Sequence, residues 1–436
     1  MKHSLLLLAS VVLVLNSAVA VWAQEDPKPP NGFYFASPLS LSAGYDDNFV
    51  FNSQEMDDTV SILTAPTFFW AKTTRRTEFA VDYQPDFEFF SRSPELNAWN
   101  HSSRLRYNYR LNPRLDFEAG NYFLSTIDAT PRLAGSQFLP PRGRFKQNAF
   151  FSGLKYRLAP QTKLFLHFDN AITTMALPGA QAHRFDQMAN AGTVLLDHVV
   201  NPRHSVTGSY AYLRVRPLDS NESIGDSVLH AANAGYTHTV NPGLILRMAG
   251  GVVRGRETAY TVGAAVEKRL RGVWMMAGYQ RYISFFGGFA PSGGLAGGTD
   301  AFANGLSPNA LFQAVSLRVR GKLSRRMGLE LNGQHGRESI ADRGVRSLIG
   351  QSRLDYKLSE RFTVFARAEY YGQNLNRFFE SPLSRRRYFG GLEITLSAPP
   401  GAEGPLGRLD ATPQRGRRAA DRRSPRSGGD IPDGTK

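Results

Sequence analysis

The sequence predicts an all-β fold: a transmembrane, antiparallel up-and-down β-barrel of about eighteen strands, with short periplasmic turns and longer extracellular loops. Apolar and polar residues alternate with a period of two from about residue 38 to residue 397. Tight turns alternate with longer links along the same stretch. After residue 23, no apolar run approaches the roughly 18 residues of a membrane-spanning helix, so strands remain the way to cross a membrane.

The N-terminus has the pattern of a cleaved secretory signal. Lys2 precedes an apolar run over residues 5–15, and small residues follow up to Ala20 and Ala23. We expect a signal peptide over residues 1–23 that is cleaved after Ala23, with cleavage after Ala20 as the alternative. A retained membrane anchor is the less favoured interpretation because the apolar run is short.

Composition divides the rest of the chain and excludes several chemistries. The 436 residues include no cysteine, and 52 basic against 37 acidic side chains give a net charge of +15. Disulfides, thiolate metal sites, cysteine nucleophiles and lipid-modified cysteines are therefore excluded. We expect a Pro-rich linker over residues 24–37, the barrel over 38–397, and a disordered basic tail rich in Pro, Gly and Arg over 398–436.

The alternating runs give the expected strands in order. They start near residues 39, 58, 75, 98, 114, 145, 162, 183, 204, 227, 244, 257, 273, 310, 326, 346, 361 and 386. In the run over residues 77–90, Phe79 and Val81 fall on one face, whereas Glu78 and Asp82 fall on the other. A helix would scatter these charges around its circumference, so the period favours strands.

The connections support a barrel over a sandwich. Seven tight turns all follow even-numbered strands, and the links after odd-numbered strands are mostly longer. The turns are Leu111–Arg114, Ala159–Thr162, Val200–Arg203, Val240–Gly243, Leu270–Gly272, Leu323–Arg326 and Leu358–Arg361. A membrane barrel collects its short turns at one end in this way, and it has an even number of strands.

One face of the strands meets lipid in such a barrel, and the other lines water. The candidate pore-lining residues are Glu78, Asp82, Asp86, Glu88, Arg104, Arg106, Arg110, Arg353, Asp355, Arg367 and Glu369. Pairing across the Ser91–Asn97 link is expected to place Glu78 opposite Arg110 and Asp82 opposite Arg106. Such a ladder either neutralises lumenal charges and fixes the strand register, or also sets a transverse field that orients charged solutes.

Two further features leave alternatives open. The links Gly287–Leu306 and Ile127–Arg144 either reach outward or fold into the lumen as a constriction. Basic residues near the strand ends are expected at the rim, where they contact anionic lipid headgroups or are simply solvated. These are Arg214, Arg216, Arg254, Arg256, Arg343 and Arg385–Arg387.

Catalytic and nucleic-acid-binding patterns are absent from the sequence. The histidines are scattered, and no HExxH, GxSxG or GxxxxGK[ST] motif occurs. We expect no enzymatic activity, no metal and no cofactor. A barrel-scaffold hydrolase built from a few loop residues is the alternative that spacing does not reveal. Without a basic helix or an aromatic stacking module, nucleic acid is not an expected partner.

Short phrases in the sequence resemble a known family. Leu41–Val50, the acidic pair Asp57–Asp58 before an apolar strand, and turns of the Leu-Asn-Pro-Arg-Leu type are similar to the outer-membrane β-barrel porins sometimes called the BBP2 group. The resemblance spans about residues 38–397. It implies an outer-membrane location and a channel or export role, because members also occur near exopolysaccharide-export genes, and it carries over no catalytic residues.

The predicted function is a porin-like channel in a Gram-negative outer membrane, for passive diffusion of small hydrophilic solutes with a mild preference for anions. The alternative is an outer-membrane component of exopolysaccharide export. Expected partners are outer-membrane lipid and lipopolysaccharide, the barrel-assembly machinery, and the solutes or polysaccharide. Gly391–Leu396 has the spacing of an assembly signal, although a tail follows it. No interface is marked in the sequence, so monomer and homo-oligomer both stay open.

Overall fold

The computed structural model describes most of the expected barrel. The described residues are 31–49, 56–128, 142–176, 186–218, 226–255, 258–284, 310–340, 343–374 and 382–396. They form one antiparallel sheet of 20 strands, with a single short 3₁₀ turn, η2 (Pro94–Leu96). Within these residues, no helix has the length and apolar character needed to cross a membrane.

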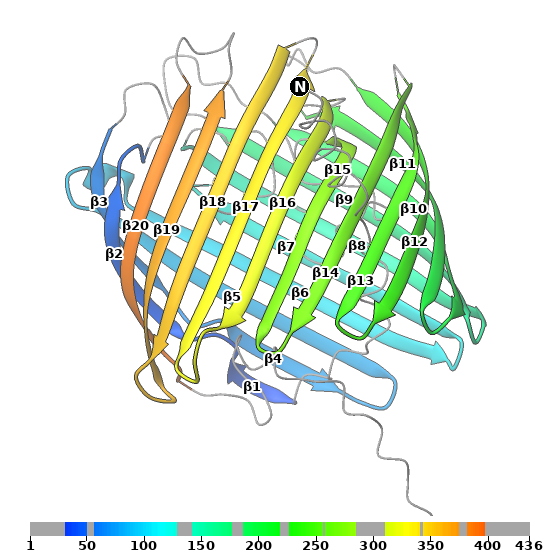
Figure 1. Ribbon diagram of the computed structural model, residues 1–436, viewed down its shortest axis with the longest axis horizontal. Helices are drawn as coiled ribbons and strands as arrows, with labels where there is room; N and C mark the ends of the chain where they lie inside the picture. Colours follow the sequence, from blue (N-terminus) through cyan, green and yellow to red (C-terminus); the bar gives the residue numbers. More distant parts are fainter. Residues whose placement is uncertain are drawn as a thin grey trace, which may run out of the picture.

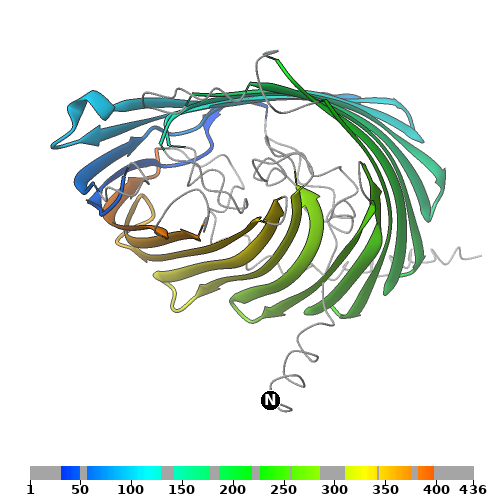
Figure 2. The ribbon, with the colours of Figure 1, turned by 90° about the horizontal axis from the view of Figure 1, so that it is seen from above.

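The sheet closes into a ring, which Figure 2 shows from above. Closure occurs where β2 (Leu39–Asp46) pairs with both β3 (Asp58–Thr64) and β20 (Leu383–Ile394). The short strands β1 (Gly32–Phe35) and β4 (Phe68–Thr73) continue β2 and β3, so the 20 strands occupy eighteen positions in the wall. The predicted fold class, an all-β barrel of about eighteen strands, is confirmed.

The other wall strands are long and tilted relative to the barrel axis (Figure 1). They are β5 (Thr77–Phe90), β6 (Ala98–Asn112), β7 (Leu115–Thr126), β8 (Arg144–Ala159), β9 (Thr162–Ala176), β10 (Gln187–Asn201), β11 (His204–Pro217), β12 (Ser227–Asn241), β13 (Leu244–Arg254), β14 (Thr258–Leu270), β15 (Val273–Ser284), β16 (Ala310–Lys322), β17 (Met327–Ile340), β18 (Arg343–Lys357) and β19 (Phe362–Asn374). Each begins close to its predicted start, and the largest offset is at β10, which was expected near residue 183.

The first two wall positions are interrupted at the same level. The Ala36 N–H donates to the Thr67 carbonyl at 2.9 Å, which joins the two interruptions. Against β5, the partners move from Thr64 opposite Asp86 to Phe68 opposite Tyr83, so one extra residue bulges out between β3 and β4. The predicted linker over residues 24–37 therefore extends too far, because its Gly32–Phe35 segment forms β1.

The tight turns have a simple local cause. The side-chain oxygens of Asn112, Asn201 and Asn241 each accept a hydrogen bond from the backbone N–H two residues later, at 2.8–2.9 Å. Ser324 and Ser359 do the same with their hydroxyls in two further turns. In the Leu270–Gly272 turn, one of the two that remain, Gly272 adopts φ +78°, a conformation that disfavours other residues. These residues set the hairpin register locally.

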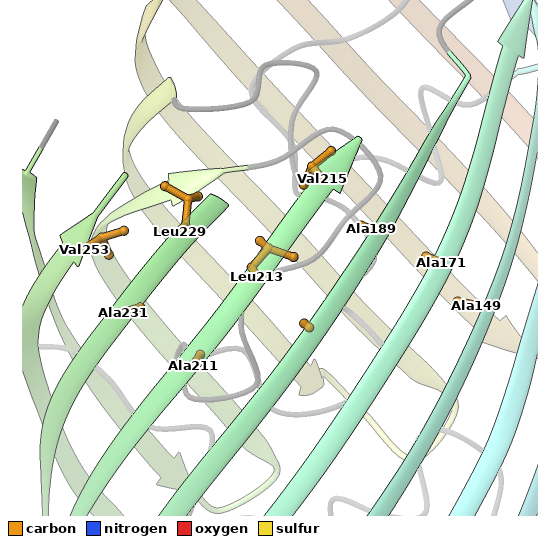
Figure 3. Packing of buried hydrophobic residues seen from close by; sticks show 10 residues of the cluster. Ala149, Ala171, Ala189, Ala211, Leu213, Val215, Leu229, Ala231 and Val253 are labelled. Carbon is orange, nitrogen blue, oxygen red and sulfur yellow. The ribbon is translucent and has the colours of Figure 1, made fainter. Parts of the chain in front are cut away.

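The two faces of the wall differ as period-2 alternation requires. On β11, Ala211 and Leu213 are 3% and 1% exposed, whereas Tyr210 and Tyr212 between them are 47% and 37% exposed. The buried positions face the barrel interior, and the exposed apolar positions face outward. Across β8–β13 the interior face carries a cluster of small apolar side chains (Figure 3): Ala149, Ala171, Ala189, Ala191, Ala211, Leu213, Val215, Leu229, Ala231 and Val253.

Candidate functional site: an ion-paired inner wall

The inner face of β16–β20 carries six arginines, which we call the arginine wall. They are Arg318, Arg320, Arg353, Arg367, Arg385 and Arg387. Strand register aligns them, since Glu330 of β17 lies between Arg320 and Arg353, and Arg353 lies opposite Arg367. The wall therefore comes from the regular pairing of five strands.

Carboxylates on the same inner face neutralise part of this charge. Arg353 pairs with Asp355 at 2.8 Å and with Glu393 at 2.7 Å, and Arg320 pairs with Glu330 at 2.7 Å. The side chains of Arg320 and Glu330 are 38% and 32% exposed, so this part of the inner wall remains accessible to water. Charged groups on an inner face need that contact with water or with partners, because burial without either is costly.

Aromatic rings on the inner face hold several guanidinium groups in place. Arg353 lies 4.3 Å from the ring centre of Phe365, and Arg367 and Arg387 lie 4.6 and 4.8 Å from that of Phe389. Such stacking fixes the planar group while leaving its edge available for carboxylates.

At the end of the barrel where the long links lie, the arginine wall runs into a fully buried cluster of charges. Arg385 bonds Asp46 at 2.6 Å and Asp128 at 2.8 Å, and all three side chains are 0% exposed. Arg387 contacts Asp46 at 3.1 Å and Glu369 at 3.3 Å. We call Asp46, Asp128, Glu369, Arg385 and Arg387 the buried cluster.

Both described ends of the 127–144 link are fixed inside the barrel, one of them through the buried cluster. Asp128 follows β7 but bonds Arg385 of β20, which is several wall positions away. Arg142, at the other end of the link, pairs with Glu88 at 3.0 Å and stacks 4.4 Å from the ring centre of Phe90. The two described ends thus lie in the lumen. The other link for which folding inward was considered, 287–306, lies outside the described residues.

The charge of Asp128 is strongly favoured in this setting. Burial alone would raise the pKa of its carboxyl, but Arg385, Arg387 and Arg142 outweigh burial and hold the pKa well below its ordinary value of 3.8. The Asp128 carboxylate is therefore ionised at neutral pH and contributes a negative charge to the cluster.

On β5 and β6 the predicted ladder exists with a different register. Asp82 lies opposite Arg104, and Glu78 opposite Asn108, which corrects both predicted pairs by two residues. Arg110 pairs instead with Asp116 of β7 at 3.2 Å. The shift arises because η2 (Pro94–Leu96) occupies the link and the hairpin closes at Glu88 opposite Ala98.

All the predicted pore-lining residues have the inward parity of their strands, but they fall into three places. Glu78, Asp82, Arg104, Arg106 and Arg110 lie together on β5 and β6. Arg353, Asp355, Arg367 and Glu369 belong to or adjoin the arginine wall. Asp86 and Glu88 are buried, and the Asn100 amide donates to both carboxylates at 2.8 and 3.1 Å.

Sequence reasoning missed the centre of the buried cluster. Arg385 and Arg387 were expected at the exposed rim, yet they are 0% and 2% exposed. Only Arg386, between them, points outward, with a side chain 58% exposed. The alternation across these three residues could have separated them. Asp128 and Arg142 gave no such signal, because they lie in an irregular link.

A smaller group of inward charges lies at the opposite end, near the tight turns. Glu267 of β14 accepts from Arg247 at 3.0 Å, from Arg269 at 2.7 Å, and from the indole N–H of Trp274 at 3.0 Å. Across the described ranges, no group of histidine and acidic side chains has the geometry of a metal site. The inner wall is therefore rich in ion pairs over much of its length.

Comparisons with known proteins add a likeness of fold. No protein-family description matches the chain, and no curated protein matches it. Among solved structures, it is similar to a BenF-like porin from Pseudomonas fluorescens Pf-5, with 11% identity, 83% of this chain and 98% of that one covered, and a TM-score of 0.46. It is also similar to OccAB4 of Acinetobacter baumannii, with 10% identity, 84% and 99% covered, and a TM-score of 0.44.

The siderophore receptor PirA of Pseudomonas aeruginosa is a third similar structure, with 10% identity, 84% and 81% covered, and a TM-score of 0.39. Similarities this weak carry no argument about activity. What the strands themselves define is a class of architecture, the closed antiparallel barrel with an apolar exterior and a charged interior.

Proposed function

We propose that this chain is a porin-like channel of a Gram-negative outer membrane, through which small hydrophilic solutes diffuse passively, with a preference for anions. The observation that carries the proposal is the closed wall of eighteen positions with large apolar side chains exposed on its outside and ion-paired side chains inside. Exposure of such an apolar band around a closed sheet is unfavourable in water and favourable in a lipid bilayer.

The interior supports a water-filled path. A ring of about 16–18 strands is too wide for its own side chains to fill. Half-exposed pairs such as Arg320 with Glu330 are compatible with an aqueous lumen and costly in a dry one. In this proposal the predicted pore-lining residues that keep contact with water, such as Glu78, Asp82, Arg104 and Arg353, line that path, and the link ends at Asp128 and Arg142 narrow it.

The preference for anions is proposed from the positive net charge of the chain, +15. Within the arginine wall itself, Asp46 and Asp128 balance Arg385 and Arg387, and Glu330, Asp355, Glu369 and Glu393 balance the other four arginines. A lumen and rim with excess basic side chains raise the local anion concentration. Transport by diffusion needs no cofactor, and we propose no enzymatic activity.

The remaining organisation is proposed on the sequence alone. Residues 1–23 act as an export signal, the tight turns face the periplasm, and 398–436 form a basic tail; the first and last of these segments lie outside the described residues. Membership of the BBP2-like group and insertion by the barrel-assembly machinery belong to the same proposal, which leaves monomer and homo-oligomer open. Export of exopolysaccharide is the competing function, because inward aromatic rings such as Phe365 and Phe389 could stack on sugars once uncovered.

The test is conductance of the purified full chain in planar lipid bilayers. A steady open conductance with a reversal potential on the anion side in a KCl gradient is expected. Arg353→Gln should move that potential toward cation selectivity, because it leaves Asp355 and Glu393 without their shared partner. Arg346→Gln, on the outer face of the same strand, is the matched control. A barrel without conductance would contradict the channel proposal and favour an exporter. An open barrel whose ion selectivity is the same in Arg353→Gln would contradict the role given to this arginine.

A further inference from the structure

The outside of the barrel carries a second row of basic side chains, distinct from the arginine wall. Arg281 of β15 lies opposite Gln313 of β16, Gln313 opposite Arg337 of β17, Arg337 opposite Arg346 of β18, and Arg346 opposite Asn374 of β19. We call these five residues the outer arginine row. Neighbouring strands lie about 4.8 Å apart, so five polar side chains follow one another across the surface.

Alternation places this row on the outer face. Immediately next to it along β16 and β18, Ala314 and Ser347 are 2% and 3% exposed and face inward. One step further along the same strands, Val315 and Leu348 are 49% and 48% exposed and face outward with the row. The row thus borders the exposed apolar surface, at the end of the barrel opposite the tight turns.

Arg337 and Arg346 form a like-charged pair directly across two strands. Both are exposed, and neither makes an ion pair with a carboxylate in the described part of the chain. Like charges in this position destabilise a strand pair. A bound anion between the two guanidinium groups would remove that cost, and the row itself contains no acidic residue to do so.

Arg281 is held ready for a similar contact. Its guanidinium lies 3.7 Å from the ring centre of the outward-facing Tyr260, and its Nε is buried without a hydrogen-bond partner. Stacking on an aromatic face fixes the planar group, so that the Nη donors at its edge, rather than the buried Nε, would meet a ligand oxygen.

We propose that the outer arginine row binds a phosphate group of lipopolysaccharide in the outer leaflet. This rests on the proposed outer-membrane orientation, in which the tight turns face the periplasm and the row lies at headgroup level. Arginine forks match phosphate oxygens in a bidentate way, and the amides of Gln313 and Asn374 add neutral donors between and beside them. The lipid thereby supplies the negative charge that the Arg337–Arg346 pair lacks.

The experiment compares the full chain with the double variant Arg337→Gln and Arg346→Gln. Lys268→Gln is the control, since Lys268 lies on the same face at the tight-turn end of β14. Each protein is first checked for the mobility shift between unboiled and boiled samples and for conductance. Binding of labelled lipopolysaccharide is then titrated in neutral detergent micelles, alongside dephosphorylated lipopolysaccharide and inorganic phosphate as competitors.

The double variant should fold and conduct, and it should bind lipopolysaccharide about tenfold more weakly than the control, as expected for the loss of charge-assisted hydrogen bonds. Without lipid it should melt at the same or a higher temperature than the unaltered chain, because the repulsion is gone; with lipid the order should reverse. Dephosphorylated lipopolysaccharide should compete poorly, and inorganic phosphate should not compete at the same phosphate concentration.

Equal affinity of a folded, conducting double variant would overturn this assignment while leaving the channel intact. Full competition by inorganic phosphate would overturn the lipid as the ligand. Failure of the unaltered chain to show the mobility shift or any conductance would instead refute the outer-membrane channel, and the lipid site with it.

Discussion

Asp128→Asn should destabilise the barrel strongly, although the change is nearly isosteric. In the folded chain the Asp128 carboxylate accepts two hydrogen bonds from Arg385, at 3.2 and 2.8 Å, and lies 3.8 Å from both Arg387 and Arg142. The amide keeps the shape but removes the charge. Three buried guanidinium groups then share the remaining carboxylates, and removal of one partner from a buried ion pair costs about 3–5 kcal/mol.

The comparison variant is Asp226→Asn. Asp226 also lies just outside a strand and binds an arginine, Arg214, but their side chains are 44% and 46% exposed. Solvent screens such a pair, so its removal should change stability little. Both substitutions replace a carboxylate by an amide, one in a buried ion pair and one in an exposed ion pair. The difference between their changes in unfolding free energy therefore measures the effect of burial.

The assay is urea-induced unfolding of the refolded protein in detergent, followed by tryptophan fluorescence and by heat-modifiable gel migration. Single-channel recording supplies a second readout. Since Asp128 fixes one end of the 127–144 link to β20, its loss should also increase open-channel noise or mean conductance. A loss of stability below about 1 kcal/mol, or no difference from Asp226→Asn, would refute the view that the buried cluster stabilises the closed barrel.

Three further outcomes follow from the same structure. The pKa of Asp128 is held below its ordinary value of 3.8, so its contribution to stability should be complete above that pH and should fall only as the solution is acidified below it. Unfolding measured at stepwise lower pH will test this, and Asp128→Asn should lose this part of the pH dependence. Leu317 is 52% exposed on the outward face of β16, so Leu317→Lys should lower the free energy of unfolding in lipid vesicles by about 2–4 kcal/mol if the position is near the bilayer midplane. Ser316→Lys, on the inner face, should lower it far less and should change ion selectivity. Asn201→Ala removes the side-chain acceptor of the tight turn before β11 and should cost about 1 kcal/mol in the same unfolding assay, with the inner wall and its selectivity unaffected.

Sequence patterns predicted the strands and turns well because both are local. Alternation over ten or more residues fixes a strand and its two faces, and an Asn or Ser at a turn fixes the hairpin beside it. The register of β5 with β6 was wrong by two residues, since the link contains η2, the strand pairing ends at Glu88 opposite Ala98, and no sequence pattern marks where this hairpin turns. The face of the sheet on which a side chain lies could therefore be predicted, whereas the residue opposite it on a strand joined by a long link could not.

The buried cluster escaped prediction for a different reason. Period-2 alternation says that Arg385 and Arg387 share a face, but it says nothing about depth or about which distant residue meets them. Their partner Asp46 is 339 residues away from Arg385, and Asp128 is 257 away. Only closure of the ring brings these side chains together, so a list of charged rim residues was the most that local patterns could supply.

The seam between β2 and β20 explains why buried charges are useful there. Every other neighbouring pair in the wall is joined by a turn or link, whereas the first and last wall strands are joined by none and need another means of fixing their register. Asp46 lies directly opposite Arg387, and Gly44 lies opposite Phe389. A slip of one residue would bring the exposed Arg386 or Tyr388 opposite Asp46 and turn one strand's inner side chains outward. Any side chain at Gly44 would collide with the Tyr388 carbonyl and the Phe389 ring, so this close alignment of the two strands requires glycine. The ion pairs of Asp46 and the space at Gly44 together specify the seam that no turn specifies, which gives the buried charges at this end of the wall a structural role.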